Sequence, residues 1–98
     1  MSWLEFTWDK RKAADNLRKH GVSFDEASSV FTDDSALLLG DPEHSTEEAR
    51  FLLLGLSAEL RTLVVCHCYR ASEDQIRIIS ARKASRPERR QYAERWRR

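Results

Sequence analysis

The sequence predicts one α+β domain with a mainly antiparallel sheet packed by helices, in the order β-α-α-β-β-β-β-α. Three observations support this fold class. Capped segments with helical spacing lie near the beginning and at the end of the chain, and four short apolar runs lie between them. The links between these runs are short, which favours antiparallel neighbours. A chain of 98 residues holds one core and not two, so we expect a single domain over residues 1–98.

The first half of the chain predicts a strand and two helices. Residues 3–8 alternate between two faces, as a short strand does. Asp9 is suited to cap a helix that ends at Gly21, and a capping box from Ser23 to Glu26 starts a second helix. The buried stripes expected for these helices are Ala13, Ala14 and Leu17 in the first and Phe24, Ala27, Val30 and Phe31 in the second.

The second half predicts four strands and a closing helix. Residues 36–39, 51–56, 63–69 and 75–81 are the apolar runs. Ser85 and Glu88 form another capping box around Pro87, and Tyr92, Ala93 and Trp96 supply the apolar stripe of the last helix. We expect the helices to cover one face of the sheet and to leave the other face available for a ligand.

The charge of the chain is divided between its halves. Residues 1–49 carry 5 Lys and Arg against 11 Asp and Glu, whereas residues 50–98 carry 12 against 5. Eleven of those twelve basic residues are arginine. The planar guanidinium group binds two phosphate oxygens at once, which the lysine ammonium does not. A local arginine-rich field in a nearly neutral protein therefore indicates nucleic acid as the partner to consider first.

Several classes of protein are disfavoured. No apolar run approaches the roughly 18 residues of a membrane span, and the first residues lack the pattern of a secretory signal. Cys66 and Cys68 would share a buried strand face without forming a disulfide, so we expect a cytoplasmic protein. His67 would face away from them, which makes a metal site unfavourable, and we expect no cofactor. Only three glycines occur, and there is no glycine-rich phosphate loop.

Arginines at the predicted strands are the candidate phosphate-binding groups. Arg77 lies between buried isoleucines, and strict alternation places Lys83 on its side of the strand. Arg82 follows in the same strand, while Arg50 and Arg61 precede two others, so a meander would gather some of them on one surface. The alternatives are a cross-strand ion pair of Arg77 with Glu47 or Glu48, and a solvated edge at Arg82 and Lys83.

Two histidines have both structural and functional interpretations. His20 precedes Gly21 at a helix end, where capping competes with an RNA contact. His67 is interpreted first as a hydrogen-bonded sheet residue and second as a general acid or base. The acidic residues from Asp33 to Glu48 are interpreted first as a solvated loop and second as ligands of Mg²⁺.

The chain resembles the BrnT family of bacterial toxins through an ordered set of segments. The set comprises FTWD (6–9), NLRKHGVSFDEA (16–27), VF (30–31), Asp41, HS (44–45), EAR (48–50), GLS (55–57), IRIISARKA (76–84), ER (88–89) and Tyr92. The resemblance implies a fold similar to RelE and a ribonuclease that arrests translation as the toxin of a type II toxin–antitoxin pair. It also implies a BrnA-like antitoxin that neutralises the toxin, carries a DNA-binding domain and alone brings the complex to operator DNA.

The resemblance also implies a site that works without metal, through basic residues on the sheet and a residue near the last helix. We expect in-line attack of a ribose 2′-hydroxyl on the adjacent phosphate, with Glu48, His67, Tyr92 or His20 as the base. Tyr92 is alternatively a core residue. The expected catalytic residues are Arg50, Arg61, Arg77, Arg82 and Tyr92, and the expected RNA contacts are Lys19, His20, Lys83 and Arg86.

The competing hypothesis is a module without catalytic activity, which pairs with a DNA-binding antitoxin and acts in repression of its operon. A binding surface tolerates exchange of arginine for lysine, whereas a bidentate transition-state clamp does not. We further expect an acidic antitoxin segment to cover the arginine surface.

Overall fold

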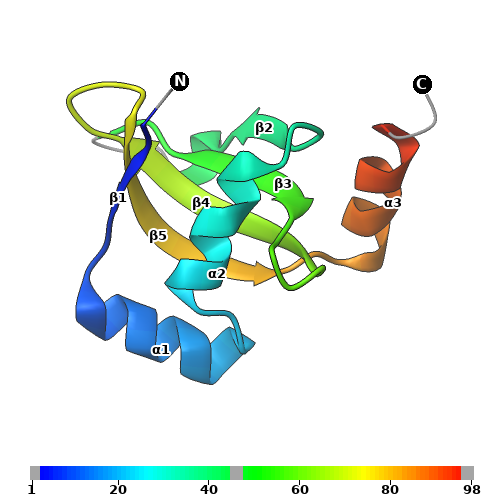
Figure 1. Cartoon of the computed structure of the whole chain (residues 1–98), viewed down its shortest axis with the longest axis horizontal. Coiled ribbons are helices and arrows are strands. Elements are labelled where there is room, and N and C mark those ends of the chain that lie inside the picture. The colour runs from blue at the N-terminus through cyan, green and yellow to red at the C-terminus, as the bar shows by residue number, and fades with distance from the viewer. Residues whose placement is uncertain (1–2, 45–47, 96–98) are drawn as a thin grey trace.

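The computed structural model describes residues 3–44 and 48–95, which form a five-stranded sheet, three α-helices and two short 3-10 helices (Figure 1). The order of strands and α-helices is the predicted one, and the boundaries differ by a few residues. The elements are β1 (Glu5–Thr7), α1 (Lys10–His20), α2 (Phe24–Ser29), η1 (Val30–Thr32), β2 (Leu37–Gly40), η2 (Pro42–His44), β3 (Phe51–Leu56), β4 (Thr62–Tyr69), β5 (Gln75–Lys83) and α3 (Arg86–Arg95).

The predicted caps set the ends of α1 and α2. Oδ1 of Asp9 accepts hydrogen bonds from two backbone N–H groups in the first turn of α1, at 2.9 and 3.0 Å. Gly21 ends α1 in the left-handed conformation, with φ of 68°, which glycine adopts without a Cβ penalty. The Oγ of Ser23 accepts a hydrogen bond from the N–H of Glu26, at 3.0 Å, and starts α2.

The sheet has the strand order β1-β5-β4-β3-β2. Strands β2 to β5 form an antiparallel meander, and β1 pairs in parallel with the outer side of β5, with Phe6 opposite Ile76. The expectation of a mainly antiparallel sheet is therefore confirmed. Strand β2 lies at the other edge.

The main core lies between α1, α2 and one face of the sheet, which we call the helix face (Figure 1). Val22, Phe24, Ala27 and Val30 are fully or almost fully buried against side chains from β3, β4 and β5. Each of the buried valine and phenylalanine side chains contributes roughly 1.5–3 kcal/mol when it leaves water. The sheet residues of this core are Leu53, Leu63, Val65, Ile76, Ile78 and Ala81.

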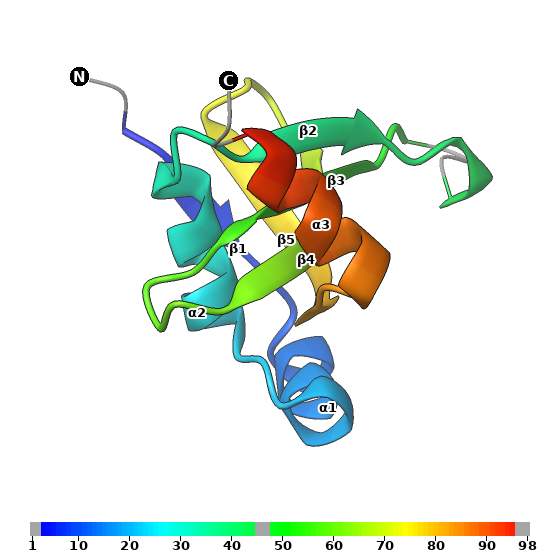
Figure 2. The ribbon, with the colours of Figure 1, turned by 90° about the vertical axis from the view of Figure 1, so that its right-hand side faces the viewer.

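The expectation that all helices lie on one face is wrong. Helix α3 packs on the opposite face, where Tyr92 and Ala84 join Leu54 and Val64 in a second cluster (Figure 2). The reason is visible in β3, whose sequence FLLLGL places leucines on both faces, so both faces need cover. Trp96, assigned from the sequence to the same stripe as Tyr92, lies outside the described residues.

Asp33 ties α3 to the rest of the fold. Its Oδ2 accepts hydrogen bonds from the N–H of Leu56, at 2.8 Å, and from the hydroxyl of Tyr92, at 2.5 Å. A Cβ at position 55 would come within 3.0 Å of this oxygen and within 2.9 Å of two apolar side chains. Gly55 therefore provides the space in which the Asp33 carboxylate meets the sheet.

Asn16 replaces Leu17 as the buried residue of α1. Leu17 is 52% exposed, whereas Asn16 is 6% exposed and fastens α1 to β5. Its Nδ2 donates to the carbonyl oxygens of Val22 and Ala81, at 2.9 and 2.8 Å, and its Oδ1 accepts from the N–H of Ala81, at 3.1 Å. No helix in the described part of the chain has the length and apolar content needed to cross a bilayer.

We expect Asn16→Ala to lower the free energy of unfolding by about 3 kcal/mol, because three buried backbone groups lose their partner. Leu17→Ala is the matched control and should change it by less than about 1 kcal/mol. Urea unfolding followed by circular dichroism measures both values. Equal losses in the two variants would contradict this account of α1.

Candidate active site

A bulge in β5 decides which basic side chains share a face of the sheet. Arg77 pairs with Cys68 and Ser80 pairs with Cys66, although 77 and 80 differ by an odd number, and the register shifts between Cys66 and His67. The extra residue, Ile79, reverses the alternation. Arg77, Ser80 and Arg82 consequently lie on the face opposite α1 and α2, which we call the arginine face.

Lys83 therefore does not share the side of Arg77, and the expectation from strict alternation is wrong. Lys83 pairs with Leu63, whose side chain belongs to the core beneath α1 and α2. The bulge has moved Lys83 to the helix face and Arg82 to the arginine face.

Arg50 joins this arrangement from the position directly before β3. It lines a pocket with Leu52 of β3, Cys66 of β4 and Arg82 of β5. Arg50, Arg77 and Arg82 thus lie on one face of the sheet. Helix α3 covers only another part of that face, near Leu54 and Val64.

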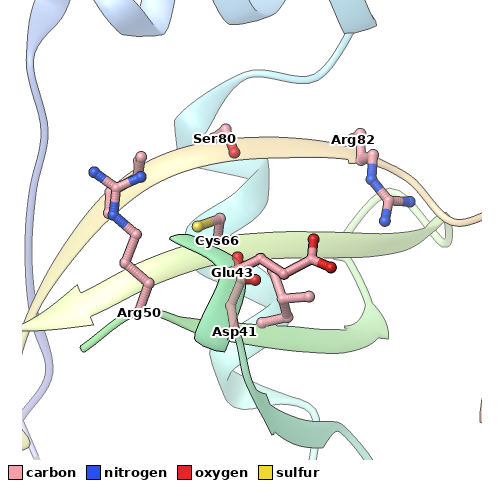
Figure 3. Close-up of a pocket in the computed structure, with 8 residues that line it drawn as sticks. Asp41, Glu43, Arg50, Cys66, Ser80 and Arg82 are labelled. Atoms are coloured by element: carbon pink, nitrogen blue, oxygen red, sulfur yellow. The ribbon is translucent and has the colours of Figure 1, made fainter. Parts of the chain in front are cut away.

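Arg50 and Arg82 line one pocket of about 340 Å³ on this face (Figure 3). In that view the two guanidinium groups lie at its two ends, and Asp41 and Glu43 lie between them. Arg77 lines a separate hollow with Glu5, Thr7, Arg70 and Gln75. The other pocket residues are Leu52, Cys66, Ile79 and Ser80.

Cys66, at the floor of the pocket, lies near charges of both signs. Burial raises the pKa of the Cys66 thiol, the charge of Asp41 raises it further, and the charge of Arg50 opposes this rise. The thiol is therefore protonated and unsuited to act as a nucleophile at neutral pH. The pocket combines cations that hold phosphate with carboxylates that accept a proton.

Glu88 holds Arg82 in place from the first turn of α3. Nη1 and Nη2 of Arg82 donate to the two carboxylate oxygens of Glu88, at 2.7 and 2.9 Å. Oε1 of Glu88 also accepts from the N–H of Ser85, at 2.8 Å, as the predicted capping box requires. The bonds from Arg82 are the main reason that the pKa of Glu88 falls to about 2.

Arg61 is directed away from the pocket. Its Nε donates to Oε2 of Glu26 at 2.9 Å, Nη2 pairs with Oε1 of Glu26, and Nη2 also donates to the carbonyl oxygen of Gly21 at 2.9 Å. The Arg61 bonds lower the pKa of the buried Glu26 carboxyl. This arginine ties β4 to the helices and does not line the pocket.

Tyr92 also lies outside the pocket lining. It is 6% exposed in the second core cluster, and its hydroxyl donates to Asp33. Burial works against ionisation of Asp33, but the N–H of Leu56 and the Tyr92 hydroxyl hold its pKa below the ordinary value. The position of Tyr92 thus agrees with the alternative from the sequence that it is a core residue.

The four expected RNA contacts do not gather at this pocket. Lys19 and His20 are exposed in the last turn of α1, Lys83 is exposed at the end of β5, and Arg86 is exposed at the start of α3. The pocket lining includes none of them.

The side chains expected as the general base also lie outside the pocket lining. His67 is buried on the helix face, and burial lowers its pKa. Glu48 forms an ion pair with Arg70 at 3.3 Å rather than with Arg77, and Glu47 lies outside the described residues.

Sequence reasoning missed Asp41 and Glu43, which it assigned to a solvated loop. The resemblance included Asp41, which could have marked that residue, but it did not include Glu43.

Over residues 3–44 and 48–95, no group of three or more His, Cys, Asp or Glu side chains is arranged to hold a metal ion.

Comparisons with known proteins agree on one family. A family model described as "Ribonuclease toxin, BrnT, of type II toxin-antitoxin system" matches residues 8–88. The crystal structure of the Brucella abortus ribonuclease toxin BrnT has the same fold, with a TM-score of 0.62 and 24% sequence identity. That match covers 85% of this chain and 99% of the Brucella chain. A search among curated protein sequences finds no match.

The acid dependence of stability should report the bond between Arg82 and Glu88. A carboxyl with a pKa of about 2 in the folded state and 4.5 as its ordinary value stabilises the fold above pH 4.5 and loses that contribution as the pH falls towards 2. We expect the urea midpoint of Glu88→Gln to fall less than that of the wild type across this range. Glu94→Gln, an exposed change on the same helix, is the control. Identical slopes for Glu88→Gln and the wild type would refute this.

Tyr92→Phe should lower the free energy of unfolding by about 1–2 kcal/mol, because Asp33 loses one hydrogen bond to its carboxylate. RNA cleavage by the folded variant should stay within about threefold of the wild type, since the hydroxyl is outside the pocket. Unfolding curves and cleavage rates below the melting temperature separate the two effects. A large loss of cleavage with unchanged stability would make Tyr92 a catalytic residue.

Proposed function

Because the chain belongs to the BrnT family of ribonuclease toxins of type II toxin–antitoxin systems, we propose that it cleaves RNA in the pocket between Arg50 and Arg82. The reaction proceeds without a metal ion and arrests translation. The observation that carries this proposal is the arginine face, where Arg50, directly before β3, and Arg82 of β5 line one pocket with Asp41 and Glu43, and Arg77 of β5 lies on the same face.

The proposed reaction is an internal transfer of the phosphodiester. The ribose 2′-oxygen forms a bond to the adjacent phosphorus, and the bond from phosphorus to the 5′-oxygen breaks. The products are a 2′,3′-cyclic phosphate and a 5′-hydroxyl end. The proton of the 2′-hydroxyl passes to the carboxylate of Glu43, and the leaving oxygen takes a proton from water. The hydroxide that remains takes the proton from Glu43, which restores the carboxylate.

The arginines supply the electrostatic part of catalysis. The phosphate gains negative charge in the transition state, and guanidinium groups fixed beforehand stabilise that charge without reorganising. Glu88 keeps the Arg82 group in position through two hydrogen bonds. Arg77, in its separate hollow, binds a neighbouring phosphate of the RNA. Arg86 extends this basic path, and Lys19, His20 and Lys83 contact RNA outside the pocket.

Membership of a type II system implies an antitoxin protein. We propose that this partner is BrnA-like, carries the DNA-binding domain that reaches the operator, and meets the toxin in the cytoplasm, where the RNA is. An acidic segment of the antitoxin covers the arginine face and excludes RNA by charge and by volume. High salt should weaken this contact, because screening shortens the range of exposed charges.

We expect Arg50→Lys and Arg82→Lys to lower RNA cleavage by about 100-fold each, because lysine does not reproduce the bidentate contact. The assay uses purified protein, EDTA and an RNA oligonucleotide, with a matched oligonucleotide lacking the 2′-hydroxyl at the cleaved position as the resistant control. Arg18→Lys, an exposed change on α1, should leave the rate unchanged.

The same variants decide between an enzyme and a binding module. Cleavage that is retained in both lysine variants, or that ceases when EDTA is added, contradicts the proposed mechanism. No cleavage and no growth arrest by folded wild-type protein favours the binding module.

A further inference from the structure

We propose that the antitoxin anchors to this toxin through a second pocket, on the helix face, by inserting one apolar side chain that is flanked by a lysine or arginine. We call it the aromatic pocket. The inference rests on the proposed function only in that it takes the partner to be the antitoxin. It concerns a surface distinct from the arginine face.

The aromatic pocket lies at the end of the sheet that α1 and α2 leave uncovered. Its volume is about 420 Å³, and its apolar lining comes from η1, the segment before β1, and strands β2 to β5. The face is the one that carries the main core, since Ile76 belongs to that core and Phe31 and Tyr69 pack against it. The lining residues are Leu4, Phe31, Leu38, Phe51, Tyr69 and Ile76, with Glu73 and Asp74.

The aromatic side chains at the floor of the pocket, Phe31, Phe51 and Tyr69, are held by ring contacts with one another and with the buried His67 beneath them. The ring of His67 lies 4.8 Å from that of Phe31 and 5.2 Å from that of Tyr69, and the rings of Phe51 and Tyr69 are 5.2 Å apart. Burial lowers the pKa of His67, so its imidazole is neutral at pH 7. Its Nδ1 lies 3.1 Å from the carbonyl oxygen of Val65, and its Nε2 lies 3.3 Å from the Tyr69 hydroxyl. A fixed floor lowers the entropy cost of binding.

The rim of the aromatic pocket selects the charge of its occupant. The two charged residues in the lining are Glu73 and Asp74, in the hairpin between β4 and β5. Burial raises the pKa of Tyr69, and the charge of Glu73 raises it further, which places that carboxylate within electrostatic reach of the floor. An acidic rim repels the RNA backbone and attracts a basic side chain. The pocket therefore fits a polypeptide segment in which an apolar side chain is flanked by a basic residue.

Strand β2 connects the aromatic pocket to the arginine face. It is an edge strand, and its Leu38 and Leu39 are 51% and 39% exposed. Leu38 lines the aromatic pocket, and Asp41, three residues later, lines the pocket with Arg50 and Arg82. An extended segment that follows this edge reaches both surfaces, and exposed edge strands commonly bind such segments. The same partner thereby anchors on one face and blocks the other.

Two variants of the aromatic pocket test the proposal. Leu38→Glu places charge on its wall, and the double variant Glu73→Lys, Asp74→Lys reverses its rim. The matched controls are Leu60→Glu, at a leucine that is 79% exposed in another turn, and Glu94→Lys on α3. The probe is the antitoxin encoded beside the toxin gene, with affinity measured by calorimetry and RNA cleavage measured in parallel.

We expect each pocket variant to weaken antitoxin binding by at least about tenfold, while cleavage and both controls stay within about twofold of the wild type. Affinities of the pocket variants within twofold of the wild type overturn the proposal. So does a loss of cleavage without a loss of antitoxin binding. Light scattering measures the mass of each pocket variant in the absence of antitoxin. If that mass differs from the wild-type mass while the antitoxin affinity is unchanged, the surface is a contact between two copies of the toxin, and the proposal is also overturned.

A different outcome would contradict the proposed function. Wild-type protein without cleavage in the same assay contradicts the ribonuclease, whatever the affinity of the pocket variants for the antitoxin.

Discussion

The central strands are buried on both faces, and this burial dictates where the helices and the open part of the sheet lie. Strand β3 carries leucines on both sides, and β4 between its neighbours is almost entirely buried. One face is covered by α1 and α2, and α3 must cover the other. Because α3 reaches only the region around Leu54 and Val64, the remainder of that face stays open, and Arg50, Arg77 and Arg82 lie on this open part.

The bulge at Ile79 turns the open face into a site. Without the extra residue, Arg77 and Arg82 would lie on opposite faces, since their numbers differ by five. With it, both arginines share the arginine face with Arg50, and Glu88 at the start of α3 fixes Arg82. One residue of the capping box therefore begins the last helix and also holds Arg82, so the stability of α3 is linked to the position of a side chain that we propose acts on RNA.

The candidate site shows which inferences from sequence were reliable. The sequence identified Arg50, Arg77 and Arg82 as candidates, but Arg77 and Arg82 share a face only because of the bulge, which strict alternation did not predict. The same bulge separates Lys83 from Arg77. Arg61 precedes a strand in the same way, yet Glu26, distant in sequence, binds its guanidinium. Asp41 and Glu43 looked like any acidic loop, because nothing local distinguishes a carboxylate beside arginines from a solvated one.

Patterns within a few residues or along the whole chain were enough to predict the order of elements, the caps at Asp9, Ser23 and Ser85, the meander and the family resemblance. Other features appear only in the folded chain, namely the parallel pairing of β1, the burial of Asn16 in place of Leu17, the helices on both faces of the sheet and the partners of Arg61 and Tyr92. These depend on contacts between residues far apart in the chain, where shape and unsatisfied polar groups outweigh local preference.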